Sequence, residues 1–286
     1  MVDSVLLSSL QLGTRSKETP VQKLSMKEKM KTILLVVFIL LGVPVFGQQV
    51  SMPGCEQYFG YSLGFDNIKE ENLLPKIHTG VMHMFSYGLD LRGERYHRFQ
   101  LRLGYGNIKT DIEREAGTYH GHVAVTYFQG FKIFEREKVQ FYFGPRASFT
   151  SSLYEYEVWD EAHAHWGNFL SLGLGNSVAL LVGERKSFLL HFDCTLLGLY
   201  TRPDPYRLYA NEYWTFSNIV KLMNSHYRVG SVNNAFQLNA SAEYRTPLFR
   251  SSALSFSFSL FYSRIKADVG KPLREFTPKL SMGVWL

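Results

Sequence analysis

The sequence is poor in the features that define disulfide-rich and helical membrane proteins. It contains two cysteines in 286 residues, Cys55 and Cys194. An exported chain with this pair has at most one disulfide of its own, and Cys194 is more simply interpreted as a small apolar residue on a strand. After Val45 no apolar run reaches the about 20 residues that a membrane-spanning helix needs. The chain beyond that point is therefore soluble, or crosses a membrane only as strands.

The sequence also lacks a run of basic residues in the region 48–286. Six basic and three acidic residues lie in 1–47, so 25 basic and 22 acidic residues remain and leave a net charge of +3. A charge this balanced does not favour nucleic acid as a partner. Aromatic residues are abundant instead, with 22 Phe, 17 Tyr and 4 Trp.

The region 1–47 has the pattern of an export leader. Lys27, Lys29 and Lys31 precede the apolar run 33–45, and Gly47 follows it. A positive head, a short apolar core and a small terminal residue predict a signal peptide cut after Gly47. A spanning helix would need a longer run. Residues 1–25 are interpreted as an upstream extension, with Met26 or Met30 as the start. Lipidation of Cys55 is not expected, because the apolar core ends well before it.

The end of the chain alternates with period two. Phe276, Leu280 and Met282 fall on one face, and Lys279 and Trp285 on the other. Similar alternation predicts ten strands, with eight to twelve as the range, in a single barrel domain over 48–286. The ten predicted strands are Tyr58–Asp66, Ile77–Asp90, Tyr96–Asn107, Tyr119–Phe134, Val139–Thr150, Phe169–Val182, Phe188–Tyr200, Ala235–Arg245, Ala253–Ile265 and the C-terminal strand 276–286.

The connections between these strands alternate in length. The short ones are predicted at 91–95, 135–138, 183–186 and 246–250, and the long ones at about 67–76, 107–118, 151–168, 201–234 and 266–275. Short turns on one side and long loops on the other are typical of an all-β, antiparallel, up-and-down transmembrane β-barrel. The stretch 201–234 leaves room for a further hairpin.

A soluble lipocalin-like barrel or sandwich would also alternate, with its apolar face toward a core. Here the face opposite the large apolar residues is rich in Gly, Ser, Asn and Gln with sparse charges. That composition favours the packed interior of a narrow membrane barrel over a solvated exterior.

With these features the chain resembles the outer-membrane β-barrel proteins of Gram-negative bacteria, and Val45-Phe46-Gly47-Gln48 is similar to leaders of the Bacteroidota. The resemblance implies an outer-membrane location, contact with outer-membrane lipid, insertion by the barrel assembly machinery, and no cofactor. The terminal residue of this class is usually aromatic, whereas here it is Leu286.

Two histidine pairs raise the question of a metal site. His120 and His122 are two apart on one predicted strand and so share a face, which we expect to point inward. His163 and His165 repeat the spacing in the predicted third long loop, beside Asp160 and Glu161. Two imidazoles with a carboxylate suit zinc or copper, but the spacing is common and the sequence identifies no further ligand.

The remaining function classes are less well supported by the residues. A rim-active hydrolase of lipid or peptide is an alternative, although the acidic pairs of omptin-like proteases and a His-x-Ser element are missing. A narrow solute channel is another. It would be lined by charged side chains that the alternation turns inward, and these fit an internal salt-bridge network better. They are Arg98, Arg102, Arg146, Asp193, Glu243, Glu275 and Lys279.

The fourth long loop is the strongest candidate for a binding surface. It is rich in aromatic residues, which favour contacts with protein, glycan or lipid when they are exposed on a rigid scaffold. These residues are Tyr206, Tyr209, Tyr213, Trp214 and Phe216. The same residues are equally consistent with a cap over the barrel mouth. The sequence therefore predicts an outer-membrane barrel with a structural role or a loop-based binding role.

Overall fold

The computed structural model describes residues 55–69, 77–109, 118–156, 163–183, 186–202, 227–249, 252–266 and 271–286. All regular elements in these ranges are strands. They are β1 (Cys55–Lys69), β2 (Ile77–Leu91), β3 (Arg95–Lys109), β4 (Thr118–Arg136), β5 (Val139–Tyr156), β6 (His163–Leu181), β7 (Ser187–Thr201), β8 (Arg228–Ser231), β9 (Ala235–Phe249), β10 (Ser252–Ile265) and β11 (Leu273–Trp285). Within them no helix is long and apolar enough to cross a membrane.

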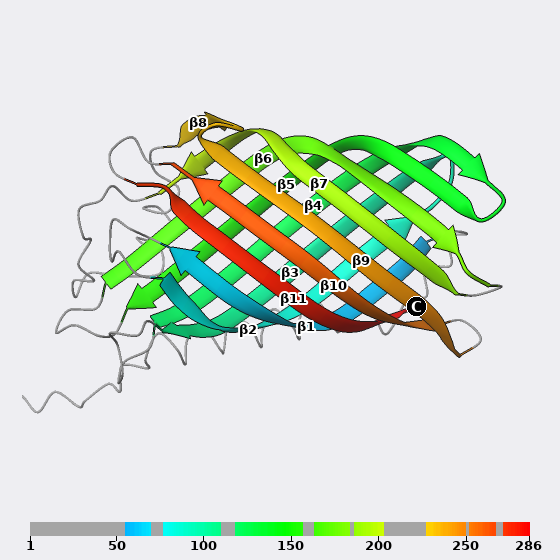
Figure 1. Cartoon of the computed structure of the whole chain (residues 1–286), viewed down its shortest axis with the longest axis horizontal. Coiled ribbons are helices and arrows are strands. Elements are labelled where there is room, and N and C mark those ends of the chain that lie inside the picture. The colour runs from blue at the N-terminus through cyan, green and yellow to red at the C-terminus, as the bar shows by residue number, and fades with distance from the viewer. Residues whose placement is uncertain are drawn as a thin grey trace, which may run out of the picture. The chain divides into compact units, whose positions relative to one another are not determined.

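The strands close into an antiparallel barrel (Figure 1). Each strand pairs with its neighbour in the chain, except that β7 pairs with both β8 and β9, and the circle is completed where β1 pairs with β11. β8 and β9 run in the same direction along β7, so they are two parts of one barrel strand. The barrel therefore has ten strands, as the alternation predicted.

A short break separates β8 from β9. The backbone N–H of Asn234 donates to Ser231 O at 2.9 Å, and Asn234 O accepts from the N–H of Lys266 at 2.7 Å. These bonds fix the break against the end of β10. Sequence reasoning began this strand at Ala235 and missed β8, because a three-residue interruption destroys the period-two pattern there.

The C-terminal strand closes the barrel in the predicted place. Tyr58 pairs with Trp285 and Leu63 with Leu280. The N–H of Leu286 donates to Gln57 O at 2.8 Å, and the N–H of Gln57 donates to Leu286 O at 3.0 Å. Leu286 thus completes the ladder through its backbone, which any residue type can do.

Several strands are longer than the sequence predicted. β5 continues to Tyr156 and β6 begins at His163, so the predicted loop 151–168 was wrong over most of its length. β9 likewise continues to Phe249, through residues predicted as a turn. The predicted strands have 9 to 16 residues, which is already enough to cross a bilayer. A barrel wall can continue beyond the bilayer, because each added ladder pair satisfies more backbone groups.

The two faces of the wall have opposite character. Along β10 and β11 the side chains of Phe258, Leu280 and Met282 point outward and are about half exposed, while Ser255, Thr277 and Lys279 point inward and are buried. In β1 the ring of Tyr58 lies flat over Gly60 and Gly283, where any Cβ would collide with it, and packs 4.8 Å from the Trp285 ring. Large interior side chains thus fill the barrel because glycines make room for them.

Three apolar clusters occupy parts of the interior. Ile68, Ile108, Tyr154 and Leu273 form one near the ends joined by long connections, and Phe169, Tyr200, Ala235 and Ile265 form a second at the same side. Tyr96, Phe128 and Tyr142 form the third nearer the short turns. Between these clusters the interior is charged.

Candidate functional site: the charged barrel interior

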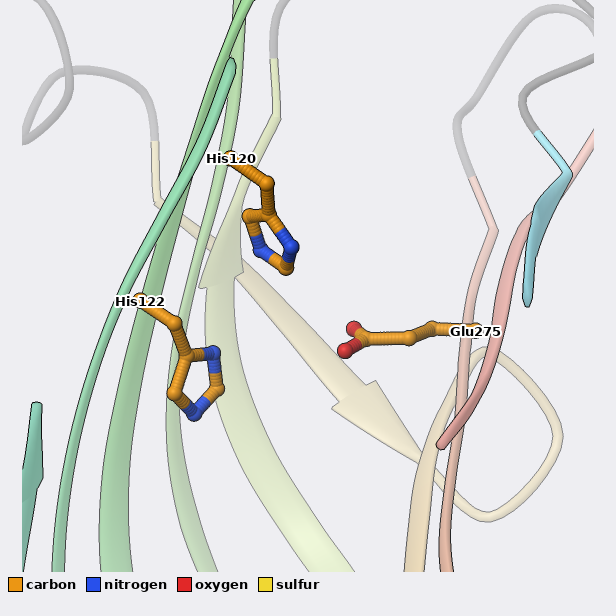
Figure 2. A group of neighbouring side chains, drawn as sticks. All are labelled: His120, His122 and Glu275. Atoms are coloured by element: carbon orange, nitrogen blue, oxygen red, sulfur yellow. The ribbon is translucent and has the colours of Figure 1, made fainter. Parts of the chain in front are cut away.

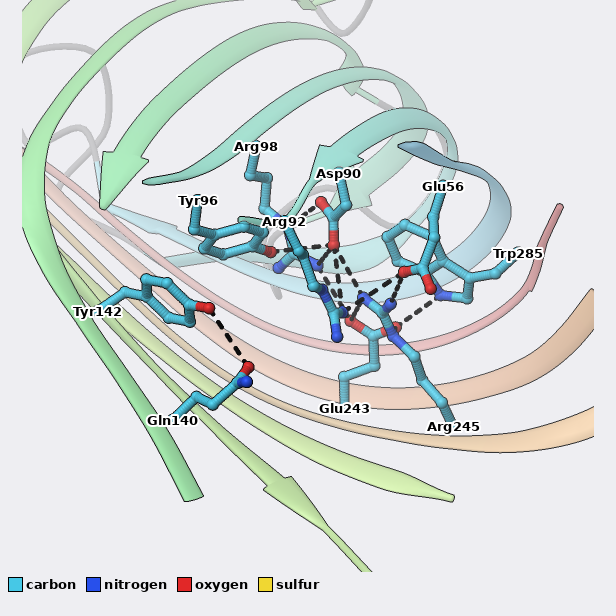
Figure 3. Close-up of polar contacts among 10 residues, drawn as sticks. All are labelled: Glu56, Asp90, Arg92, Tyr96, Arg98, Gln140, Tyr142, Glu243, Arg245 and Trp285. Carbon is cyan, nitrogen blue, oxygen red and sulfur yellow. Dashed lines mark hydrogen bonds and ion pairs between the residues drawn. The ribbon is translucent and has the colours of Figure 1, made fainter. Parts of the chain in front are cut away.

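The arginine cluster lies near the short turns (Figure 3). We define it as Asp90, Arg98, Glu243 and Arg245, with Glu56 and Arg92 at its edge. Asp90 is central, with a side chain 1% exposed. Arg98 binds it bidentately, from Nε to Oδ1 at 2.9 Å and from Nη2 to Oδ2 at 3.0 Å. Arg245 Nη2 and the Tyr96 hydroxyl also donate to Oδ2, at 3.0 and 2.9 Å.

The second carboxylate of the cluster, Glu243, joins it to the terminal strand. Arg245 Nε and Trp285 Nε1 each donate to Glu243 Oε1 at 2.7 Å. The Arg245 guanidinium also lies over the Trp285 ring, 3.5 Å from its centroid, and Arg245 Nη1 reaches Glu56 at 2.8 Å. Side chains from β1, β2, β3, β9 and β11 therefore meet across the seam where the barrel closes. Shared partners of this kind hold the strands in register.

A smaller charged group joins β5, β7 and β9. Arg146 Nε on β5 is 2.8 Å from Asp193 Oδ1 on β7, and His191 Nε2 is 3.2 Å from Asp193 Oδ2. Asn239 Nδ2 on β9 donates to the same Oδ2 at 3.0 Å. A cavity of about 70 Å³ lies between this group and the arginine cluster, with Lys279 and Trp285 also in its lining. This volume holds a few water molecules at most.

The histidine cluster lies toward the long connections (Figure 2). We define it as Asp66 of β1, His120 and His122 of β4, and Glu275 of β11. His120 Nδ1 is 2.8 Å from Asp66 Oδ2, and His122 Nδ1 is 3.1 Å from Ser152 Oγ. One potential ligand atom each from His120, His122 and Glu275 lies within 4.8 Å of the others. All three side chains are buried and point into the same space.

The structure brings together only some of the residues singled out in the sequence. His120 and His122 point inward, as expected. His163 and His165 lie in β6, where the prediction of a loop was wrong, and their side chains are outside the described residues. The loop aromatics, from Tyr206 to Phe216, also lie outside them. Both cysteines are free in the described barrel.

Two members of the histidine cluster were not predicted from the sequence as neighbours of the histidines. Glu275 was expected only as a lining residue, and Asp66 was not considered. The available signal was their inward parity: Asp66 follows Ser62 and Gly64 at spacing two, and Glu275 precedes Thr277 and Lys279. Parity gives the direction of a side chain but not its height along the barrel, so the meeting with His120 was not predictable.

Of the seven charged residues expected to line the interior, five belong to ion pairs or to the histidine cluster. Arg98, Arg146, Asp193 and Glu243 form ion pairs, and Glu275 joins the histidine cluster. Lys279 instead has its Nζ 5.3 Å from the Phe261 ring centroid. The interior thus contains a salt-bridge network across the barrel.

Neither a scan against protein-family models nor a search of curated proteins finds a match. Solved structures do resemble the chain. They include the outer-membrane protease OmpT from Escherichia coli, with TM-score 0.47, 7% identity, 82% of this chain and 97% of that chain covered. The translocator domain of the autotransporter NalP from Neisseria meningitidis gives TM-score 0.42, 9% identity and 91% and 96% coverage. Ail, the attachment invasion locus protein of Yersinia pestis, gives a TM-score of 0.34 at 12% identity, with 82% of this chain and 100% of that chain covered.

Proposed function

We propose that the protein is an integral outer-membrane β-barrel with a structural role. Its barrel, made rigid by ion pairs in the interior, would also support long loops that bind an extracellular protein, glycan or lipid. The observation that carries this proposal is the inside-out distribution of side chains. Large apolar residues cover the outer wall, whereas charged residues lie buried inside it. A soluble barrel would need the reverse, and an apolar outer band is what a lipid-facing barrel requires.

The outer wall supports a lipid-facing barrel, because exposed apolar residues follow one another at alternate positions of neighbouring strands. Phe256, Phe258 and Leu260 alternate along β10, and Leu280 and Met282 follow on β11. Each is 37–58% exposed, so water contact would be unfavourable by roughly 25 cal/mol for every Å² of apolar surface. Lipid removes that penalty, and outer-membrane lipid is the partner we propose for this surface.

The proposal is tested by expressing the full chain and fractionating the envelope. We expect a folded species in the outer-membrane fraction that migrates differently in gel electrophoresis before and after boiling. Depleting the barrel assembly machinery should remove this species. A mature product that is soluble in the periplasm, or one whose migration is unaffected by heat, would contradict the proposal.

Loop binding is tested separately from membrane insertion. A variant with the aromatic residues of 206–216 replaced by serine should insert normally, because the described barrel residues are unchanged. We expect it to lose adhesion to host-matrix proteins, glycans or lipid vesicles that the wild type retains. If the wild type binds none of these probes, the barrel keeps its structural role and the binding role is rejected.

The channel alternative is disfavoured by the filling of the interior. The 70 Å³ cavity is lined by Asp90, Arg98, Arg102 and Lys279 together with bulky aromatics. We therefore expect no steady conductance in planar bilayers, and a reproducible conducting step would support the channel instead.

The hydrolase alternative has one geometric observation in its favour, the contact of Ser152 Oγ with His122 Nδ1 at 3.1 Å. Ser152 is 5% exposed, however, and its neighbour two residues on, Tyr154, belongs to the apolar cluster with Ile68. A lipid or peptide substrate would not reach this hydroxyl without opening the cluster. We expect Ser152→Ala to retain any hydrolytic activity found in the purified protein.

A further inference from the structure

The histidine cluster has a chemical composition unlike the rest of the interior. It combines two imidazoles with a carboxylate from the facing part of the wall, whereas the arginine cluster pairs guanidinium groups with carboxylates. Figure 2 shows His120 and His122 projecting from β4 toward Glu275 on β11. Two histidines and one glutamate form a ligand set suited to zinc and related divalent ions.

The geometry is open but within reach of coordination. The potential ligand atoms lie within 4.8 Å of one another. Bonds of 2.0–2.1 Å in a tetrahedral site would bring them to about 3.3 Å. Glu275 has three rotatable side-chain bonds, so rotation of its side chain is the direct way to shorten these distances.

His120 is positioned in the way that metal ligands are commonly held. Its Nδ1 contacts Asp66 Oδ2 at 2.8 Å, and Asp66 Oδ1 accepts a hydrogen bond of 2.7 Å from Thr277 Oγ1. Its Nε2 is buried and has no hydrogen-bond partner among the described residues. A carboxylate that fixes one imidazole nitrogen while the other stays free is the usual support of a metal-bound histidine.

Glu275 has weaker contacts than the carboxylates of the arginine cluster. Its Oε1 lies 3.4 Å from Thr277 Oγ1, whose shorter hydrogen bond goes to Asp66, and the positively charged groups that act on it are His120 and Lys279. Asp66, which already contacts His120 and Thr277, adds a second carboxylate to the same space. Buried carboxylates are costly unless they are paired or bind a metal, so a divalent cation would stabilise Glu275 there.

The pair His191 and Asp193 provides an internal contrast. It also places a histidine beside a buried carboxylate, at 3.2 Å. There the carboxylate lies 2.8 Å from the Arg146 guanidinium and accepts a hydrogen bond from Asn239. That pair already has a positively charged partner, and it serves as a matched control within the same barrel.

We propose that the histidine cluster binds one divalent transition-metal ion of the zinc class, with His120, His122 and Glu275 as ligands and Asp66 as the residue that positions His120. Tyr154 stacks on His120, with centroids 4.4 Å apart and planes at 21°, and the apolar cluster with Ile68, Ile108 and Leu273 covers the same end. The enclosed ion would therefore exchange slowly and join β1, β4 and β11 across the interior. The inference does not depend on loop binding.

The test uses the full mature chain without a histidine tag, refolded in detergent with and without Zn²⁺ and then dialysed. Refolding in the presence of the ion allows for the enclosure of the site. Bound zinc is measured by elemental analysis. Co²⁺ in place of zinc should give the visible absorption of a tetrahedral nitrogen–oxygen site.

Four variants make the test specific. Glu275→Gln and His122→Gln should each weaken zinc binding at least 10-fold, because each removes a ligand. Asp66→Asn should weaken it by about 10–100-fold, the usual effect of changing a residue that supports a ligand. His191→Gln, the matched control, should leave the zinc content unchanged.

The outcomes are decisive because folding is measured independently by heat-modifiable migration. One zinc per chain in the wild type and the control, lost in the folded ligand variants, supports the proposal. If one ligand variant fails to fold, the other decides. No retained zinc in the wild type, or equal zinc in all proteins, overturns the proposal, while the membrane location would stand on its own test.

Discussion

Replacing Asp90 by asparagine is the sharpest test of the interior network. The change keeps the size of the side chain and removes its charge. Asp90 accepts hydrogen bonds from Arg98, Arg245 and Tyr96 while its side chain is 1% exposed. The substitution therefore removes one of the two carboxylates that the Arg98 and Arg245 guanidinium groups share.

The expected cost follows from these contacts. Breaking a buried ion pair by removing one partner typically costs about 3–5 kcal/mol. Glu243 still accepts from both arginines, at 3.4 Å from Arg98 and 2.7 Å from Arg245, so we expect the lower end, about 3 kcal/mol. That decrease in the free energy of unfolding corresponds to a factor of more than about 100 in the unfolding equilibrium.

The assay is urea unfolding of the barrel in lipid vesicles, followed by tryptophan fluorescence and by heat-modifiable migration. Asp90→Asn should shift the midpoint to lower urea. The matched control is Lys132→Gln, which breaks an exposed pair with Glu135 at 2.9 Å and should leave the midpoint unchanged. An Asp90→Asn midpoint equal to that of the wild type would refute the reasoning, because it would show that the arginines do not need this carboxylate.

Three further predictions address other parts of the barrel. Trp285→Phe should destabilise the barrel by about 1.5–3 kcal/mol, since Glu243 loses the charge-assisted hydrogen bond from Nε1; equal unfolding midpoints would argue against that bond. Phe258→Arg should reduce the free energy of folding into lipid by about 2–4 kcal/mol, whereas Phe258→Leu should change it little, and similar effects of both would mean that the outer wall does not face lipid. Cys55 and Cys194 should both react with a maleimide in the denatured, unreduced chain, and protection of both thiols would reveal a disulfide.

The wall of the barrel was predictable because its signals are local. A period of two fixes which side chains point inward, and short charged segments such as 135–138 fix where the chain reverses. Arg98 and Asp90 illustrate how far local reasoning reaches. They are directly opposed in the β2–β3 hairpin, so a correctly placed turn is enough to predict their pairing.

Contacts across the interior were not predictable in the same way. Arg245 reaches Asp90 over 155 positions in the sequence, and Glu275 meets His120 over a similar separation. Their heights depend on the register of every strand between them. One irregularity, such as the break between β8 and β9 or the register shift between Leu172 and Gly173, changes those heights without changing the alternation.

The two ends of the interior differ in the kind of polar group that they contain, and this difference indicates where the fold is specialised. In the arginine cluster each carboxylate accepts from two arginines and from Tyr96 or Trp285, which is sufficient to explain it as a clamp on the closing strand. In the histidine cluster the Nε2 of His120 has no hydrogen-bond partner among the described residues, and Glu275 has no arginine beside it. A barrel that needed only rigidity would gain more from an apolar layer there, like that of Ile68 and Leu273. The proposed cation would give these retained polar groups a role beyond stability.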